Sequence, residues 1–288
     1  MKEQKLPFIL IFDIDNALIG NIDICNKEHN LLNLIFNICK KKNIHNDGCN
    51  KNLLDFDTVM KEGLLRPNAK DFIDFCKMKY KNVELFVYTN SSHGWTNNVL
   101  IKNIERSLGH KFNKPYFTRE YSLPYKKSLS NIYEIILRVL ISKYPKMKNK
   151  EHQEEVFNNR LIMIDDIQDN LFDFPSKLIR CPAYKYKPYY DLHTKMIEKY
   201  NISRDVFNNP EVLDFFDTNF LPIYNVNGTE KQKDMIMYNL TSLWNIRQSE
   251  LTKVSDTFFQ DLMIIMEKYS YVNNENIVKI NQQLSYSS

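Results

Sequence analysis

Glycine is scarce in this sequence, which has six glycines among 288 residues. Glycine-rich phosphate loops and dinucleotide-binding turns both need several glycines where a strand leads into a helix. The composition therefore excludes these two kinds of nucleotide site. If the protein handles phosphate, it must hold the phosphate with side chains and a metal ion.

Cysteine is also sparse, and its number and spacing do not indicate disulfide bonds. The five cysteines are an odd number, and no two of them form a Cys-x-x-Cys pair. This usage is typical of a reduced intracellular compartment, either the cytoplasm or the nucleus.

Long hydrophobic runs are lacking as well. The apolar run Phe8–Phe12 ends at Asp13, which is too early for a signal peptide or a membrane anchor. No other stretch approaches the length that is needed to span a bilayer. We therefore expect an intracellular protein without a membrane partner.

The chain also lacks a strong excess of charge of one sign. Its 39 Lys and Arg residues nearly balance 35 Asp and Glu residues, for a net charge of +4. Nucleic-acid-binding proteins concentrate far more basic charge on one face. The charge therefore argues against a nucleic-acid partner, and a hydrophobic content of 43% suits a soluble globular protein.

Short apolar runs alternate with amphipathic stretches in the first two thirds of the chain. This alternation predicts βαβ units, and hence an α/β fold with a central parallel sheet flanked by helices. Helices are expected from Asn68, from Trp95 to Leu108 and from Leu129 to Tyr144. The predicted strands are Phe8–Phe12, Val83–Tyr88, Leu161–Ile164 and Lys177–Cys181, with a weaker fifth at Pro115–Thr118.

Two regions fall outside this alternation and suggest a domain division. A polar insertion at 20–65, with one helical stretch near His29–Lys41, is a candidate for a small cap. We expect an α/β domain over 1–185 and a helical C-terminal extension over 186–288. The extension would contain helices at Thr229–Ile246 and Glu250–Tyr269 and a frayed polar tail from Asn273, and its apolar faces would pack in the core or dock a protein partner.

Polar side chains follow three of the predicted strands. Ligands of open parallel sheets bind in the crevice outside the carboxyl ends of the strands, so these side chains should converge there. Two neighbouring carboxylates would repel by about 4 kcal/mol at ~4 Å and an effective dielectric constant of ~20. The residues are Asp13 and Asp15 after the first strand, Thr89 and Asn90 after the second, and Asp165 and Asp166 after the strand predicted at Leu161–Ile164.

A divalent cation removes this repulsion, and oxygen ligands favour Mg²⁺. A metal beside a free carboxylate is suited to phosphoryl transfer, because the metal neutralises the phosphate and orients it for in-line attack. The sequence therefore predicts a magnesium-dependent phosphoryl-transfer site at the carboxyl edge of the sheet.

The same residues resemble the motifs of a known superfamily. Phe8–Leu18 resembles the first motif of the haloacid dehalogenase superfamily, Val87–Thr89 the second and Ile162–Asp166 the fourth. Within it, the chain is most similar to the NLI-interacting-factor or CTD-type phosphatases. The features shared with them are Arg66-Pro67, Tyr88–Ser92, Arg119-Glu120 and Tyr125–Ser130, and the resemblance covers residues 7–182.

The resemblance implies a Rossmann-like fold and a role for each site residue. Asp13 would be the nucleophile that forms an aspartyl-phosphate, and Asp15 would protonate the leaving oxygen and later activate water. Thr89, with backbone N–H groups near Asn90 and Ser91, would bind the phosphoryl oxygens.

The charged residues of the site also receive roles from the resemblance. Lys127 would neutralise developing charge, with Lys126 as the alternative. Mg²⁺ would be bound by Asp13, the backbone of Asp15, and Asp165 or Asp166.

The resemblance further implies a Mg²⁺-dependent phosphomonoester hydrolase that acts on phosphoserine or phosphothreonine in a protein. Three positions depart from the nearest relatives, namely Asn16, Ala17 and Ser128. Two alternatives stay open: a phosphatase for nucleic-acid ends or small metabolites, and an inactive protein of the same fold with a structural or assembly role.

Overall fold

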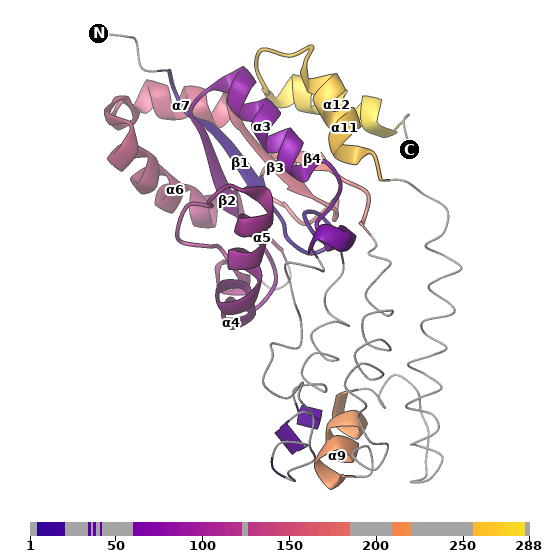
Figure 1. Cartoon of the computed structure of the whole chain (residues 1–288). Coiled ribbons are helices and arrows are strands. Elements are labelled where there is room, and N and C mark those ends of the chain that lie inside the picture. The colour runs from indigo at the N-terminus through magenta and orange to yellow at the C-terminus, as the bar shows by residue number, and fades with distance from the viewer. Residues whose placement is uncertain are drawn as a thin grey trace. The chain divides into compact units, whose positions relative to one another are not determined.

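The computed structural model describes residues 5–20, 34, 35, 37, 38, 41, 60–122, 126–184, 209–219 and 256–285. Within them, four parallel strands form a sheet in the order β2-β1-β3-β4 (Figure 1). Helices flank this sheet, so the predicted α/β class is confirmed. The strands are β1 (Phe8–Phe12), β2 (Val83–Val87), β3 (Leu161–Asp165) and β4 (Leu178–Arg180).

Each of the four main strand predictions is confirmed to within one residue at either end. The weaker fifth prediction is wrong. Pro115–Thr118 makes only an isolated parallel bridge, between Phe117 and Tyr88. Pro115 lacks a backbone N–H and cannot extend this pairing as a central strand residue would.

The helices in the described residues connect the strands and continue beyond them. Among these residues, no helix combines the length and the apolar character that a bilayer crossing requires. The α-helices are α3 (Ala69–Tyr80), α4 (His93–Trp95), α5 (Ile101–Leu108), α6 (Leu129–Lys143), α7 (Lys150–Asn159), α9 (Pro210–Asn219), α11 (Phe258–Met266) and α12 (Asn274–Ser285). Short helical turns occur at η1 (Met60–Leu64), η2 (Thr96–Leu100), η3 (Arg119–Tyr121), η4 (Pro145–Lys148) and η5 (Pro175–Lys177).

The three helices predicted between the strands are present, with two differences. Asn68 precedes α3 but has a left-handed φ of 59°, and its side chain makes no capping hydrogen bond. Helix α7 was not predicted, because its apolar residues, Val156 and Phe157, are adjacent and two neighbouring positions show no helical periodicity.

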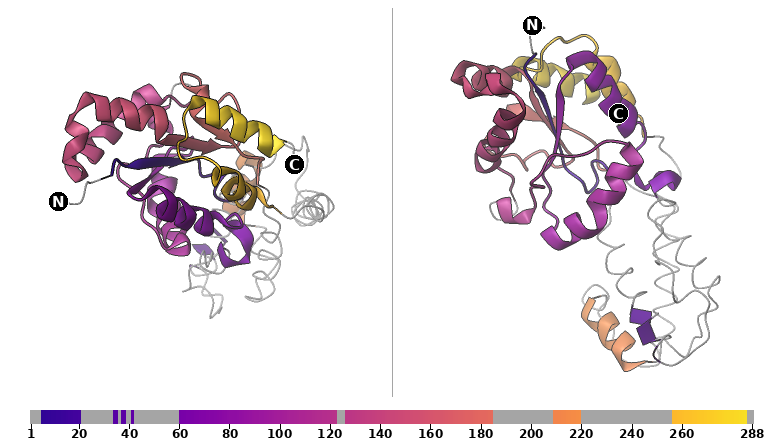
Figure 2. Two further views of the ribbon diagram at one scale, coloured as in Figure 1. Left: turned by 90° about the horizontal axis from the view of Figure 1, so that it is seen from above. Right: turned by 60° about the vertical axis from the view of Figure 1, so that its left-hand side comes forward.

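Successive side chains of β1 point to opposite faces of the sheet, and the core therefore has one half on each face. Ile9 and Ile11 point to the face that α6 and α7 cover, and they share a buried cluster with Val156. Phe12 points to the opposite face, where its ring meets that of Phe72 in α3 edge to face, at 6.4 Å between centroids. Figure 2 shows these two helical layers on either side of the sheet.

Helix α11 completes the second half of the core. Phe259 stacks on Phe72 with ring centroids 5.1 Å apart and meets Phe12 at 6.4 Å. Phe258, Leu262 and Ile265 are buried as well. The predicted core packing of this apolar face is therefore confirmed.

Helix α12 shows that the prediction of a frayed tail from Asn273 was wrong. Ile277 and Ile280 are fully buried. Asn281 covers the edge strand β4: its Nδ2 donates to the carbonyl of Leu178 (2.8 Å), and its Oδ1 accepts from the N–H of Arg180 (3.0 Å). The polar composition of the segment concealed this narrow apolar stripe.

The chain divides into two compact units. One comprises 1–20, 65–184 and 255–288, and the other comprises 21–64 and 185–254. Residues 255–288, which we expected in the C-terminal extension, belong to the first unit. They do so because α11 and α12 bury apolar side chains beside the sheet.

The structure tests only part of what we predicted for the second unit. Residues 34, 35, 37, 38 and 41 are helical, as expected near His29–Lys41. The helix expected at Thr229–Ile246 lies outside the described residues, and the capping role of 20–65 stays a prediction.

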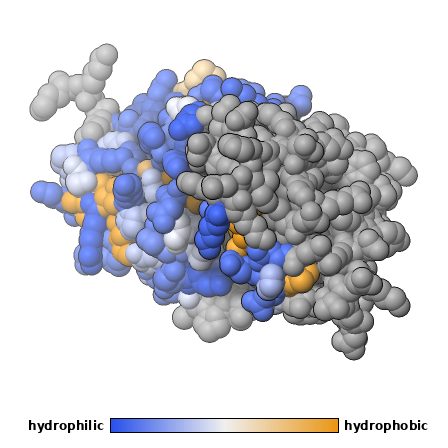
Figure 3. All heavy atoms as spheres, turned by 60° about the horizontal axis from the view of Figure 1, so that its bottom comes forward, coloured by the Kyte–Doolittle hydropathy of each residue, from blue (hydrophilic) through white to orange (hydrophobic). Residues whose placement is uncertain are grey.

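Hydrophilic side chains predominate on the described part of the face in Figure 3, with apolar areas of limited extent between them. Exposed large hydrophobic residues include Ile264 in α11 and Val278 in α12. A protein partner on these helices stays a prediction.

Candidate active site

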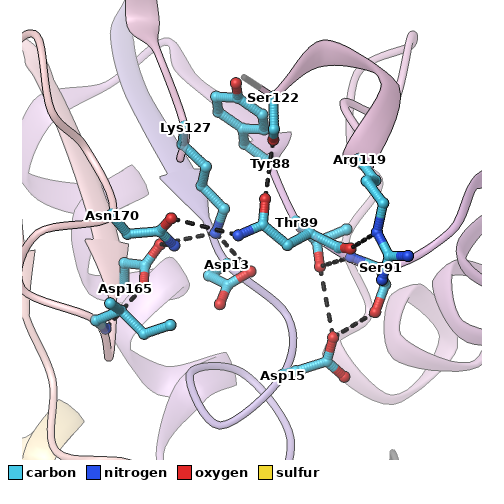
Figure 4. A network of polar contacts seen from close by, with 12 residues as sticks. Asp13, Asp15, Tyr88, Thr89, Ser91, Arg119, Ser122, Lys127, Asp165 and Asn170 are labelled. Atoms are coloured by element: carbon cyan, nitrogen blue, oxygen red, sulfur yellow. Dashed lines mark hydrogen bonds and ion pairs between the residues drawn. The ribbon is translucent and has the colours of Figure 1, made fainter. Parts of the chain in front are cut away.

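The register of the sheet brings the ends of three strands to one place. Phe12, the last residue of β1, pairs with Val87 of β2 and with Ile164 of β3. The residues that follow, among them Asp13 and Asp165, therefore meet at the carboxyl edge, and Figure 4 shows the polar contacts there. The convergence expected from the strand ends is present in the structure.

Lys127 is the central cation of this cluster. Its Nζ lies 2.7 Å from Oδ1 of Asp13 and 2.7 Å from Oδ2 of Asp165, and its side chain is fully buried. Burial lowers the pKa of Lys127, but Asp13 and Asp165 outweigh burial and raise it above its ordinary value. Lys127 is therefore charged, whereas Lys126, the alternative, is exposed.

Backbone pairing fixes the position of Lys127. Its N–H donates to the carbonyl of Asn170 (2.8 Å), and its carbonyl accepts from the N–H of Phe172 (3.4 Å). These two bonds form an isolated parallel bridge with Leu171, in the segment that follows β3. The lysine thus depends on the same segment that holds Asp165, one of the two acids it neutralises.

Three carboxylates gather around this lysine. One oxygen each of Asp13, Asp165 and Asp166 lies within 4.8 Å of the others. Burial raises the pKa of Asp13 well above its usual range; Lys127 opposes this rise, and Asp165 adds to it. Burial, followed by the charge of Asp165, also raises the pKa of Asp166. Three carboxylates and one ammonium group leave a formal charge of −2 when all are ionised.

Donors from the following segment hold Asp165 in place. Its Oδ1 accepts from the N–H of Ile167 (2.9 Å), and its Oδ2 accepts from Nδ2 of Asn170 (2.8 Å). The Asn170 amide oxygen in turn accepts from Nδ2 of Asn90 (3.3 Å). Asn170 therefore links the acid after β3 to the loop after β2.

Asp15 faces that loop and stands apart from the three-acid cluster. Its Oδ2 accepts hydrogen bonds from the hydroxyl groups of Ser91 (2.5 Å) and Thr89 (3.5 Å). The Thr89 hydroxyl also accepts from the N–H of Ser91 (3.1 Å). Binding of a metal by the backbone of Asp15 stays a prediction.

Asn90 has a supporting position in the same loop. Its side-chain oxygen accepts from the hydroxyl of Ser122 (2.8 Å), and its carbonyl accepts from Nε of Arg119 (2.8 Å). Together with its bond to Asn170, these contacts commit the Asn90 side chain to neighbouring loops. Any contribution of Asn90 to phosphate binding is therefore left to its backbone.

A second polar network lies behind Lys127, at the start of α6. Ser128 donates to Asp173 (2.8 Å) and caps the helix by accepting from the N–H of Asn131 (3.3 Å). Hydrogen bonds from Ser128 and the first turn of the helix outweigh burial and lower the pKa of Asp173. The Tyr88 hydroxyl accepts from the N–H of Ser128 (3.0 Å) and donates to the carbonyl of Tyr121 (2.9 Å). This network anchors the helix that directly follows the lysine.

Sequence reasoning missed several of these residues. The side-chain contacts of Ser91, Asn170 and Asp173 were not predicted, because Ser, Asn and Asp are ordinary loop residues. Their place within a few positions of a strand-end acid or threonine was the available signal.

The chain matches no protein-family model, and no curated protein matches it.

Proposed function

We propose that the protein is a Mg²⁺-dependent phosphomonoester hydrolase that forms an aspartyl-phosphate on Asp13. One observation carries this proposal: a single buried lysine bridges two of three clustered carboxylates. The arrangement leaves a net negative charge at the edge of the sheet where ligands of α/β proteins bind.

The residues of the cluster fit a magnesium ion. Asp13, Asp165 and Asp166 supply carboxylate oxygens, which are the hard ligands that Mg²⁺ prefers. Their formal charge of −2 with Lys127, and the raised pKa values of Asp13 and Asp166, indicate a need for a further cation. A bound Mg²⁺ would offset the charge of the phosphate and polarise it for attack.

Asp13 and Asp15 divide the first chemical step. An Asp13 carboxylate oxygen forms a bond to phosphorus as the bond from phosphorus to the leaving oxygen breaks. Protonated Asp15 delivers its proton to that oxygen, so the product leaves as a neutral alcohol. The hydroxyl groups of Ser91 and Thr89 orient Asp15 for this transfer.

The second step restores the enzyme. Asp15, now a carboxylate, takes a proton from water, and the water oxygen attacks phosphorus as the bond to Asp13 breaks. Lys127 neutralises the Asp13 carboxylate that is released, because its ammonium group already lies 2.7 Å from that residue. Inorganic phosphate then leaves the site.

The resemblance to the haloacid dehalogenase superfamily supports the same chemistry, and its CTD-type phosphatases suggest the substrate. On that basis we assign phosphoserine or phosphothreonine in a protein as the substrate. The balanced charge of the chain favours this over nucleic-acid ends.

Turnover of p-nitrophenyl phosphate by the full chain tests the proposal. We expect activity with Mg²⁺, none with a chelator, and a loss of at least ~10³-fold in Asp13→Asn. Asp71→Asn, an exposed residue in α3, is the matched control and should retain full activity.

The rival functions give different results. A folded wild-type protein that lacks turnover, or one whose rate equals that of Asp13→Asn, would favour the structural or assembly role. If turnover is present, phosphopeptides, 5′- and 3′-phosphorylated oligonucleotides and sugar phosphates should be compared, and we expect the highest kcat/KM for the phosphopeptides.

A further inference from the structure

The turn that carries Asp15 is held in place by residues outside it. Within the turn, the N–H groups of Leu18 and Ile19 both donate to the carbonyl of Ile14 (3.0 Å each). The carbonyls of Asn16, Ala17 and Leu18 each accept a hydrogen bond from another part of the chain. The conformation of the turn therefore depends on those external donors.

Arg66 supplies two of the three donors. Its backbone N–H donates to the carbonyl of Leu18 (2.8 Å), and its Nη1 donates to the carbonyl of Ala17 (3.3 Å). The third donor is the backbone N–H of Tyr184, which donates to the carbonyl of Asn16 (2.8 Å). Arg66 is thus the main external support of the turn.

Asp256, 190 positions away in the sequence, fixes the guanidinium group of Arg66. Its Oδ1 accepts from Nε (3.0 Å) and its Oδ2 from Nη2 (2.8 Å), while the Arg66 side chain is completely buried. The Oδ1 atom also accepts from the N–H of Phe258 (3.3 Å), which is the first residue of α11. The Phe258 ring centroid lies 4.6 Å from the guanidinium carbon. Asp256 is therefore anchored to a helix that belongs to the core.

This geometry determines where Nη1 points. The guanidinium group is planar, so a carboxylate that binds Nε and Nη2 together sets the direction of the remaining nitrogen. That nitrogen contacts the carbonyl of Ala17, two residues after Asp15. A change at Asp256 would thus be transmitted to the turn through one rigid group.

We infer that Asp256 is a positioning residue for Asp15, and that the C-terminal segment thereby sets the geometry of proton transfer to the leaving group. This inference rests on the proposed function, because it assigns a task to the proposed acid. Proton transfer requires the acid within about 2.6–3.2 Å of the oxygen it protonates, and a shift of about 1 Å can lower a rate 10²-fold. Attack by Asp13 depends less on the turn, since Asp13 directly follows β1 and its backbone N–H donates a hydrogen bond to the carbonyl of Ile164 (2.9 Å).

The dependence of the rate on the leaving group tests the inference. p-Nitrophenolate leaves readily without a proton, whereas the oxygen of phenyl phosphate needs one. In Asp256→Asn, we expect kcat/KM for phenyl phosphate to fall at least ~10-fold and kcat/KM for p-nitrophenyl phosphate to fall less than ~3-fold. The two substrates are compared by kcat/KM because it is set by the first step, whereas kcat also includes the hydrolysis of the aspartyl-phosphate, in which Asp15 acts in the same way for both. General loss of folded protein would lower both rates equally.

Two further variants complete the experiment. Glu275→Gln removes one carboxylate from an exposed ion pair of the same C-terminal segment and should leave both rates unchanged. Asp256→Glu keeps the charge and moves the carboxylate by one methylene, so the ratio of the two rates should change in the same direction as in Asp256→Asn, by a smaller factor. If Asp256→Asn does not fold, the rate ratio of Asp256→Glu tests the inference in its place.

The outcomes separate the inference from the proposed function. If the wild-type protein turns over both substrates and the variants at Asp256 keep its rate ratio, the inference is overturned while the proposed function stands. If the wild-type protein turns over neither substrate, the proposed function fails and the inference fails with it.

Discussion

Lys127 and Asp165 form an ion pair at 2.7 Å between two side chains that are both fully buried. The same ammonium group lies 2.7 Å from Asp13. Because the three charges are removed from water, the stability of the site depends on their mutual compensation, and replacing one changes the environment of the other two.

The first prediction concerns this compensation. Lys127→Met should lower the free energy of unfolding of the metal-free protein by about 3–5 kcal/mol, because it leaves two buried carboxylates without a cation. Adding Asp13→Asn should restore part of the loss, and urea unfolding of both single variants and the double variant gives the coupling free energy. The exposed pair of Lys279 and Glu275 is the control and should show negligible coupling. Equally small coupling at Lys127 would contradict the prediction.

The second prediction concerns metal binding. Mg²⁺ should raise the midpoint of thermal unfolding, because a ligand of the folded state stabilises it by about 2.7 kcal/mol at 100 times its Kd. The variant with both Asp165→Asn and Asp166→Asn should lose this response, whereas Asp71→Asn should keep it. Differential scanning fluorimetry, with NaCl at matched ionic strength, measures the effect. A response that NaCl reproduces would argue against a specific site.

The third prediction concerns the edge of the sheet. Asn281→Ala should lower the free energy of unfolding by about 1–2 kcal/mol, because it removes both side-chain hydrogen bonds to β4. Gln282→Ala, an exposed neighbour in α12, is the matched control. Urea unfolding measures both, and equal stabilities of the two variants would be the contrary result.

The strands and the converging acids were predictable from the sequence for one physical reason. Parallel strands buried on both faces read as continuous apolar runs, and their carboxyl ends meet at one edge. Asp13 and Asp165 could therefore be placed together from their positions after such runs, although they are far apart in the sequence.

Other features have no local signature. The pair of Arg66 and Asp256 joins residues 190 positions apart, and a single charged residue shows no periodicity. The hydrogen bond from Asn170 to Asp165 depends on the path of the loop that follows β3, and this path has no local sequence signature. The return of α11 and α12 to the sheet depends on tertiary packing, which a polar composition does not reveal.

The fourth prediction concerns Lys177, whose side chain is buried outside the cluster of acids. Its Nζ donates to the carbonyl of Asn158 (2.7 Å) and lies 5.4 Å from the ring centroid of Phe157, and among the described residues no carboxylate pairs with it. Burial lowers its pKa to about 8. Between pH 8 and about 10.5 the folded lysine is neutral while the unfolded one still binds a proton, so stability should increase with pH in this window. The increase should be roughly 1–3 kcal/mol relative to Lys177→Met, given ~1.4 kcal/mol per pKa unit.

Urea unfolding at pH 7.5 and at pH 10 measures the difference between the two proteins. The exposed Lys102→Met should follow the wild-type protein at both pH values. If Lys177→Met also follows it, the buried ammonium group carries no such penalty.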